Sequence, residues 1–163
     1  MQANEKDKIV DNKFASTAFC PLTVQIRKLA MDSEFKQTYS LVLSINPELT
    51  LLAFDERQKQ LLAEGYQCYG VFTDDSKLIA MCGFWIRHRF CYGKALHIDN
   101  IVTATDMRHR GIASLLIKRI IAEAKLNDCK VVALDTYIDN KRAQQFYLKN
   151  DLQISGLHFT HTL

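Results

Sequence analysis

The sequence lacks the features that mark membrane-spanning, secreted and metal-binding chains. None of its apolar runs approaches the roughly 20 residues that a membrane-spanning helix needs, and the N-terminus lacks the charged and then apolar layout of a secretory signal peptide. The five cysteines are an odd number with no Cys-x-x-Cys pair, and the five histidines are scattered along the chain. Neither a disulfide framework nor a metal site is indicated. We therefore expect a cytoplasmic protein with no metal centre and no membrane partner.

A strong excess of one charge is also missing. The chain has 21 Lys and Arg residues against 18 Asp and Glu residues, a formal net charge of +3, which is too mild to indicate a nucleic-acid partner. Its length of 163 residues and its hydrophobic content of 48% fit one globular domain with a full core. Residues 1–18 are polar and aperiodic, so we expect a flexible N-terminal tail followed by a single domain over 19–163.

Hydrophobic periodicity predicts a mixed architecture. Alternating residues predict strands at 24–29, 67–72, 78–87 and 96–104, and helical spacing predicts helices near 33–44, 50–64 and 110–126. The apolar run 131–134 is typical of a buried, often parallel strand, and a helix near 141–149 and two closing strands near 152–155 and 157–162 follow. The order β-α-α-β-β-β-α-β-α-β-β indicates an α+β fold. Its mixed sheet is expected to be mostly antiparallel and twisted, with one parallel βαβ unit.

The most informative segment is a strand that leads through a basic loop into a long helix. The loop over 108–113 holds two arginines and Gly111, and the helix begins directly after it. The first turn of a helix carries unpaired N–H groups and the positive end of the macrodipole. A glycine at this point lets a phosphate approach the main chain closely. This segment therefore predicts an anion site.

Two well-known phosphate motifs are absent from the segment. The chain has no Gly-x-x-x-x-Gly-Lys-Ser/Thr run, and Gly111 alone does not make the Gly-x-Gly-x-x-Gly fingerprint of dinucleotide-binding folds. Mononucleotide and nicotinamide chemistry are therefore disfavoured.

The loop resembles motif A of the GNAT family of N-acetyltransferases, whose pattern is Arg/Gln-x-x-Gly-x-Gly/Ala. The run Arg108-His109-Arg110-Gly111-Ile112-Ala113 fits each fixed position of that pattern. The segment 140–147 is similar to the family's motif B, Asn-x-x-Ala-x-x-Phe/Leu-Tyr, and it follows the next strand as in the family. The likeness covers about residues 22–162 and is closest to single-domain bacterial members. Thr105 departs from it, because a proline is common at that position.

The resemblance implies an acetyl-CoA-dependent N-acetyltransferase that acts by direct transfer in a ternary complex, with acetyl-CoA as co-substrate. The acceptor would be a primary amine of a small molecule or a peptide. The implied CoA-binding positions lie on a fourth strand splayed from the fifth, on the loop and in motif B: Ile101, Val102, Thr103, Arg108, His109, Arg110, Gly111, Ile112, Ala113, Ser114, Asn140 and Tyr147. Plain surface charge is the alternative for the two arginines, and helix capping is the alternative for Asn140.

The same resemblance suggests catalytic roles for two side chains. Presenting an amine of pKa about 10.4 in its neutral form at pH 7 costs roughly 4.6 kcal/mol, so a base is needed. Asp99 is the candidate, acting through a water, with His97 on the same face as the lesser candidate. A purely structural Asp99 is the alternative. Tyr147 would donate a proton to the departing thiolate, whereas a packing role suits the adjacent Phe146 better.

Other readings stay open at this level. A catalytically silent CoA-binding or sensing module is one, although the presence of Tyr147 argues against it. A toxin that acylates charged tRNA would need a strongly basic face. The aromatic residues Trp85, Phe90 and Tyr92 would either wall the acceptor pocket or pack in the core. The acceptor, the acyl preference and the existence of a homodimer are not determined by the sequence.

Overall fold

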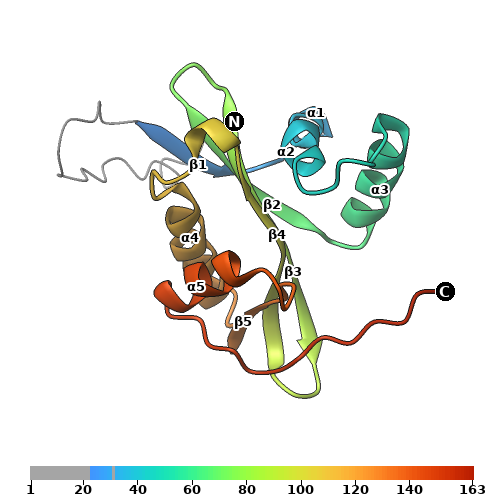
Figure 1. The fold of residues 1–163 in the computed structure, drawn as a ribbon, viewed down its shortest axis with the longest axis vertical. Helices are drawn as coiled ribbons and strands as arrows, with labels where there is room; N and C mark the ends of the chain where they lie inside the picture. Colours follow the sequence, from blue (N-terminus) through green and yellow to red (C-terminus); the bar gives the residue numbers. More distant parts are fainter. Residues whose placement is uncertain (1–22, 31) are drawn as a thin grey trace.

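A five-stranded sheet forms the centre of the molecule (Figure 1). The computed structural model describes residues 23–30 and 32–163, so the tail predicted at 1–18 lies outside the described residues. The strands follow one another in chain order: β1 (Val24–Lys28), β2 (Gln67–Thr73), β3 (Leu78–Arg89), β4 (Gly93–Thr103) and β5 (Val131–Leu134). The first four pair antiparallel, and β5 pairs parallel to β4. The predicted α+β class with one parallel unit is confirmed.

Helices cover both faces of this sheet. They are α1 (Asp32–Lys36), α2 (Tyr39–Leu43), α3 (Leu51–Ala63), the 3-10 turn η2 (Thr105–Met107), α4 (Ile112–Leu126) and α5 (Lys141–Lys149). The first three lie on one side of the sheet and α4 and α5 on the other (Figure 1). No helix of the described ranges is both long enough and apolar enough to cross a membrane.

Two hydrophobic clusters, one on each face of the sheet, hold these layers together. Strand β2 contributes to both. Successive side chains of a strand point to opposite faces, so Tyr69 packs in the cluster on the α4 side while the adjacent Cys68 packs in the cluster on the α1–α3 side. The apolar stripe of α4 completes the first cluster with Leu116, Ile117 and Ile120, all close to fully buried. The predicted stripe of this helix is thus its buried face.

The helix predicted over 33–44 is two short helices instead. The amide N–H and the hydroxyl of Thr38 both donate to the carbonyl oxygen of Phe35, at 2.9 and 2.6 Å. These bonds tighten the chain into a turn, which ends α1 before α2 begins. A threonine in the middle of an apolar helical pattern was the signal for this interruption, because its hydroxyl competes for backbone groups.

The two closing strands predicted at 152–155 and 157–162 are wrong. The chain after α5 is extended but pairs with no strand of the sheet, and Ile154, Leu157 and Phe159 are exposed. In Figure 1 this segment passes near the turn that joins β3 to β4 and runs away from the sheet. Alternation predicts where a strand can form, but a strand exists only through hydrogen bonds to a partner.

Candidate active site

Strand β4 changes its pairing on both sides at Asp99. Toward β3, Ile98 pairs with Phe84 and Asn100 pairs with Gly83, so Asp99 is the extra residue of a β-bulge. Toward β5, the parallel pairing ends at Ile98 and Leu134. Residues 99–103 of β4 therefore have β3 on one side and, within the described part of the chain, no strand on the other. We refer to this opening beyond the last β4–β5 pair as the notch.

Asp99 lies at the closed end of the notch, held by its neighbour. The Asn100 amide donates to Asp99 Oδ2 at 2.8 Å and to the Tyr66 hydroxyl at 3.1 Å. Tyr66 reaches this point because position 83 is glycine, since a Cβ there would lie 1.6 Å from the Tyr66 oxygen. No short motif in the sequence indicated this arrangement, because its members come from β3, from β4 and from the residue just before β2.

The surroundings of Asp99 make its carboxylate a stronger base than a free one. Burial by the surrounding protein atoms raises the pKa of Asp99, and this effect outweighs the opposing influence of the Asn100 hydrogen bond and of His97. The side chain nevertheless keeps solvent contact. A raised carboxyl pKa and access to water both suit a base that accepts a proton through a water molecule.

Tyr147 lies on α5, where its ring packs against the α4-side cluster. The rings of Phe146 and Tyr147 meet edge to face with centroids 5.3 Å apart. Burial, followed by the influence of the Cys82 thiol, raises the pKa of the Tyr147 phenol, so the group is protonated at neutral pH and able to donate. Burial raises the pKa of Cys82 most, and Cys68 and then Asp99 raise it further. Both predicted catalytic side chains therefore lie within electrostatic range of one buried thiol.

His97 is engaged elsewhere. Its Nε2 lies 3.4 Å from Asp135 Oδ2, and the same oxygen lies 3.4 Å from His158 Nδ1 of the C-terminal segment. These contacts join β4 to the chain just beyond β5. His97 also acts electrostatically on Asp99 and offsets part of the rise in its pKa. Because His97 contacts Asp135 while Asp99 lies at the notch, Asp99 is the better placed of the two as a base.

The N-terminus of α4 carries no side-chain cap, unlike those of α3 and α5. Thr50 Oγ1 and Asn140 Oδ1 accept hydrogen bonds from Ala53 N and Ala143 N at 3.2 and 3.1 Å, whereas the N-cap of α4 is Gly111 with a φ of +76°. A Cβ at Gly111 would meet nothing within 4 Å, so the approach to the first-turn N–H groups is open. The geometry fits a phosphate group.

Two contacts fix the loop before α4. Arg108 Nε donates to the carbonyl oxygen of Thr103 at 3.3 Å, which ties the loop to the end of β4. His109 has a φ of +63°, and its Nε2 lies 3.1 Å from a guanidinium nitrogen of Arg142 on α5. The loop is thus held between the end of β4 and α5. Behind it, the buried Ile112 anchors α4 in the core, Ala113 and Ser114 are half-buried, and Arg110 is exposed.

The predicted CoA-binding residues of β4 use their side chains for packing. Ile101 packs on the α4 side, Val102 is buried on the opposite side, and Thr103 is half-buried. Only their backbone is placed to line the notch. For Asn140 the structure shows the capping bond to Ala143, which is the alternative that the sequence left open.

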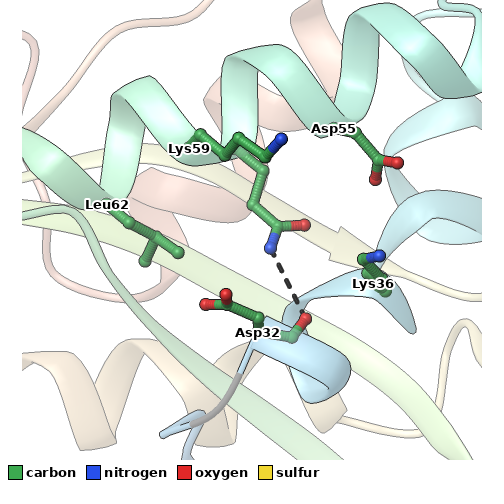
Figure 2. Close-up of a pocket in the computed structure, with 6 residues that line it drawn as sticks. Asp32, Lys36, Asp55, Lys59 and Leu62 are labelled. Atoms are coloured by element: carbon green, nitrogen blue, oxygen red, sulfur yellow. Dashed lines mark hydrogen bonds between the residues drawn. The ribbon is translucent and has the colours of Figure 1, made fainter.

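Two pockets lie beneath and beside α3. The first, of about 310 Å³, opens between α1 and α3 and is lined by six residues: Asp32, Lys36, Asp55, Gln58, Lys59 and Leu62 (Figure 2). Two carboxylates and two ammonium groups are among the lining groups, and the Gln58 amide donates to the carbonyl oxygen of Asp32 at 3.4 Å. None of its lining residues comes from β4, α4 or α5, so it is separate from the notch.

The second pocket, of about 190 Å³, reaches the notch. It lies between α1–α3 and the sheet and includes Asp99 and Asn100 in its lining. The other lining residues are mostly apolar: Phe35, Thr38, Val42, Asn46, Leu49, Phe54, Arg57, Gln58, Leu61, Leu62, Tyr66 and Met81. Sequence reasoning missed this set, because it is spread over five elements and the loops between them, and most of its members read individually as ordinary core. We call it the acceptor-side pocket.

The aromatic residues considered for this wall lie elsewhere. Phe90 and Tyr92 are exposed at the tip of the β3–β4 hairpin, and Trp85 packs edge-on against Tyr66 with centroids 5.0 Å apart. Core packing is therefore wrong for Phe90 and Tyr92, and neither residue lines the acceptor-side pocket. The long β3 and β4 strands carry them past the neighbouring β2, beyond reach of the pocket.

The cysteine thiols of the sheet are not prepared for nucleophilic attack. Cys68 and Cys82 are fully buried, and burial raises the pKa of Cys68 to about 12. A nucleophilic cysteine needs the opposite shift, because the thiolate is the reactive form. Within the two described ranges, no three His, Cys, Asp or Glu residues are grouped so as to hold a metal ion.

Comparisons with known proteins agree with this geometry. A family model described as "Acetyltransferase (GNAT) family" matches residues 26–151. The structure is similar to aminoglycoside N-acetyltransferase AAC(6')-Iy in complex with CoA, with a TM-score of 0.78 and 16% identity over 90% of this chain and 99% of that chain.

Two further solved structures have the same fold. Glucosamine-6-phosphate N-acetyltransferase from Arabidopsis thaliana has a TM-score of 0.69 and 23% identity, over 86% of this chain and 98% of that one. The aminoglycoside 6'-N-acetyltransferase AAC(6')-Ih from Acinetobacter baumannii has a TM-score of 0.72 and 18% identity, over 86% and 99%. At these identities the likeness shows the fold alone.

Proposed function

The chain belongs to the acetyltransferase (GNAT) family, and we propose that it transfers an acetyl group from acetyl-CoA to the primary amine of a small molecule. One observation carries the proposal. The notch in the sheet has Asp99 at its closed end and the uncapped N-terminus of α4 at the far end of the same strand. Acetyl transfer from a thioester with a phosphorylated tail to an amine uses both features, an anion site for the tail and a base for the amine, at a fixed separation.

The loop and the notch would hold the co-substrate. The first-turn N–H groups of α4 and the open approach over Gly111 suit a pyrophosphate. The backbone of residues 101–103, which has no strand on that side, suits an amide-bearing chain, because it offers main-chain donors and acceptors. Arg108 and His109 keep the loop in place through their contacts to Thr103 and Arg142.

The two titrating side chains would handle the protons. When bound, acetyl-CoA supplies an acyl group activated as a thioester. Asp99 accepts the ammonium proton through a water, and its raised pKa brings it nearer to that of the amine. Tyr147 stays protonated because its pKa is raised, so it is able to protonate the sulfur as the thiol leaves. Direct transfer agrees with the buried, unactivated thiols of Cys68 and Cys82.

The test is an acceptor screen with the purified chain and acetyl-CoA. Free CoA thiol is measured with a thiol reagent, and the acetylated amine is identified by mass spectrometry. We expect amine-dependent release of CoA. If acetyl-CoA binds but no amine in a broad panel raises the release of CoA above background, the transferase proposal fails and a sensing role replaces it.

A further inference from the structure

We propose that the acceptor is a monoamine on a compact apolar body, such as phenethylamine or a branched alkylamine, held in the acceptor-side pocket with its ammonium group at Asp99. This inference rests on the proposed acetyl transfer, because it names the substrate class of the same site. It is carried by the size, the lining and the charges of the pocket, which neither the family nor the solved structures determine for this chain.

The pocket is in the right place for an acceptor. Asp99 belongs both to its lining and to the closed end of the notch, where β4 leaves β5. An amine at this carboxylate therefore lies where the notch meets the pocket, with its body directed beneath α1–α3. The other pocket, between α1 and α3, has no lining residue on β4.

The size of the pocket limits the body of the amine. A dry cavity of about 150 Å³ lined by aliphatic and aromatic side chains holds a benzene molecule. The acceptor-side pocket, at about 190 Å³, therefore takes one ring or a branched alkyl group. Sites for larger, drug-sized ligands run from roughly 300 to 1,000 Å³, so only part of a multi-ring amino sugar would fit inside this pocket.

The lining favours an apolar body. Phe35, Val42, Phe54, Leu61 and Met81 bring aromatic, branched and thioether groups from α1, α2, α3 and β3. An apolar group that moves from water into such a lining gains roughly 25 cal/mol per Å² of buried area, which amounts to a factor of about 10 to 100 in affinity for one ring.

Several polar groups of the lining are already bonded within the protein. The Thr38 hydroxyl donates to Phe35, the Tyr66 hydroxyl accepts from Asn100, and the Gln58 amide donates to Asp32. Gln58 Oε1 is the exception, because this buried acceptor has no donor among the residues of the described part of the chain. A sugar would bring many hydroxyl groups into this lining and leave most of them without partners, which is costly.

The charges of the lining select for one ammonium group. Asp99 is the carboxylate of the pocket and Arg57 is its cation. A second ammonium group on the acceptor would meet the Arg57 guanidinium without a further carboxylate to pair with. The aminoglycosides named for two of the solved structures carry several ammonium groups, and a shared fold does not transfer that preference.

The first experiment compares acceptors of matched reactivity. The probes are phenethylamine, 3-methylbutylamine, ethylamine, 1,4-diaminobutane and an aminoglycoside, each with saturating acetyl-CoA. We expect kcat/KM for phenethylamine to exceed that for ethylamine by about 10- to 100-fold, and to exceed those for the diamine and the aminoglycoside. A preference for the aminoglycoside or the diamine would overturn the inference while the transferase proposal stands.

Variants of the lining locate the site. Val42→Phe fills the pocket, so KM for phenethylamine should rise about 10-fold or more while KM for acetyl-CoA is unchanged. Leu52→Phe on the outer face of α3, where the side chain is 71% exposed, is the matched control. Should the Val42→Phe variant fail to fold, Leu61→Ala enlarges the same pocket and should improve a naphthyl-bearing amine over phenethylamine. Unchanged selectivity in the folded variants would refute the location.

A charge reversal tests the selection against diamines. Arg57→Glu gives the pocket a second carboxylate, so the ratio of kcat/KM for 1,4-diaminobutane to that for phenethylamine should rise about 10-fold, on the scale of one desolvated ion pair. Lys59→Glu makes the same change on α3 in the other pocket and should leave the ratio unchanged. Equal effects of the two variants would contradict the role of Arg57.

Calorimetry separates failure of the inference from failure of the proposed function. Phenethylamine should bind the protein in the presence of CoA, and Val42→Phe should abolish the signal. Binding without any transfer would overturn the transferase proposal and keep the pocket assignment. Transfer to other amines without binding of phenethylamine would overturn the pocket assignment and keep the transferase proposal.

Discussion

At the scale of single residues, the fold shifts two protonation equilibria in the direction that acetyl transfer needs. Burial raises the pKa of Asp99, so its carboxylate is more basic, and burial raises the pKa of Tyr147, so its phenol stays protonated. Both residues were identified by their places in a motif or a strand. The shifts themselves depend on neighbours such as Asn100 and Cys82, which a motif does not include.

Asp99→Asn removes the proposed base. At pH 7 we expect kcat/KM to fall by roughly 10²-fold or more, the usual scale of general-base catalysis. The wild-type rate should fall with decreasing pH through the pKa of Asp99, above the ordinary carboxyl value of about 3.9, because only the carboxylate accepts a proton. The pH profile of CoA release at a fixed amine concentration measures this. Asp74→Asn, in the exposed β2–β3 turn, is the control, and an unchanged profile in Asp99→Asn would rule out the base role.

Tyr147→Phe removes the proposed acid but keeps the aromatic ring. We expect kcat to fall by roughly 10²-fold, with little change in the melting temperature, because the ring continues to pack on Phe146. Steady-state CoA release and thermal unfolding measure the two effects. Tyr137→Phe, an exposed tyrosine just before α5, should be neutral. A kcat equal to that of the wild type would mean that Tyr147 only packs.

At the scale of elements, the site is made where regular structure stops. The β4–β5 ladder ends at Ile98, β4 bulges at Asp99, and α4 begins at an uncapped glycine. Each interruption frees backbone groups that a continuous ladder or a capped helix would have used.

Gly111→Ala tests the α4 N-terminus. A φ of +76° is unfavourable for alanine by roughly 1–2 kcal/mol, although the added Cβ meets no atom within 4 Å. We expect a loss of about 1 kcal/mol in unfolding free energy and a several-fold weaker Kd for CoA, measured by calorimetry. Gly156→Ala in the exposed C-terminal segment, where φ is not in the left-handed region, should change neither. Unaltered CoA affinity in Gly111→Ala would remove the loop from the binding site.

A buried polar network joins α4 to the sheet. Glu123 accepts hydrogen bonds from the Lys28 ammonium at 2.8 Å and from the Tyr69 hydroxyl at 2.7 Å, and Arg119 donates to the same hydroxyl at 2.9 Å. Burial acts to raise the pKa of Glu123, but the bonds from Lys28 and Tyr69 outweigh it and the net pKa is lowered. The network therefore stabilises the carboxylate form.

Glu123→Gln should lower the unfolding free energy by about 1–2 kcal/mol at pH 7, as for a hydrogen-bonded charge whose Lys28 partner is partly exposed. Because the folded pKa is lowered, the contribution is present above the unfolded value near 4.3 and is lost as pH falls through the lower folded value. Urea denaturation at pH 7 and pH 3 measures this difference. Glu56→Gln on the exposed face of α3 should have no effect. A difference between wild type and variant that is as large at pH 3 as at pH 7 would show that the charge is not responsible.

At the scale of the whole molecule, the sheet ends in a short strand with one partner. β5 has four residues paired with β4, and the C-terminal segment after α5 pairs with no strand of the sheet in the described chain. That segment carries exposed apolar residues and is linked to the sheet through the contact between His158 and Asp135.

Deleting residues 156–163 should change the unfolding free energy by less than about 1 kcal/mol, because an exposed ion pair contributes no more than that. Denaturation at two protein concentrations, together with sedimentation, measures the effect and detects a change of oligomeric state. A large, concentration-dependent loss of stability would contradict this prediction and would mean that the segment pairs with a second copy of the chain.

The sequence by itself determined most of the layers and the position of the loop and helix N-terminus that we propose as the anion site. Alternation and helical spacing are local, so β2, β3, β5, α4 and α5 are found close to their predicted ranges. The turn at Thr38 and the unpaired C-terminal segment were missed, because each depends on a specific hydrogen bond or on the absence of a partner strand.

Only the tertiary structure decided what surrounds Asp99. The bulge, the end of the β4–β5 ladder, the Tyr66 ring over Gly83 and the pocket beneath α1–α3 bring together side chains that are far apart in sequence. Hydrophobic pattern specifies which residues are buried, but not which of them leave a space between them. The shape of that space follows from three-dimensional packing. The class of amine that we propose follows from that shape.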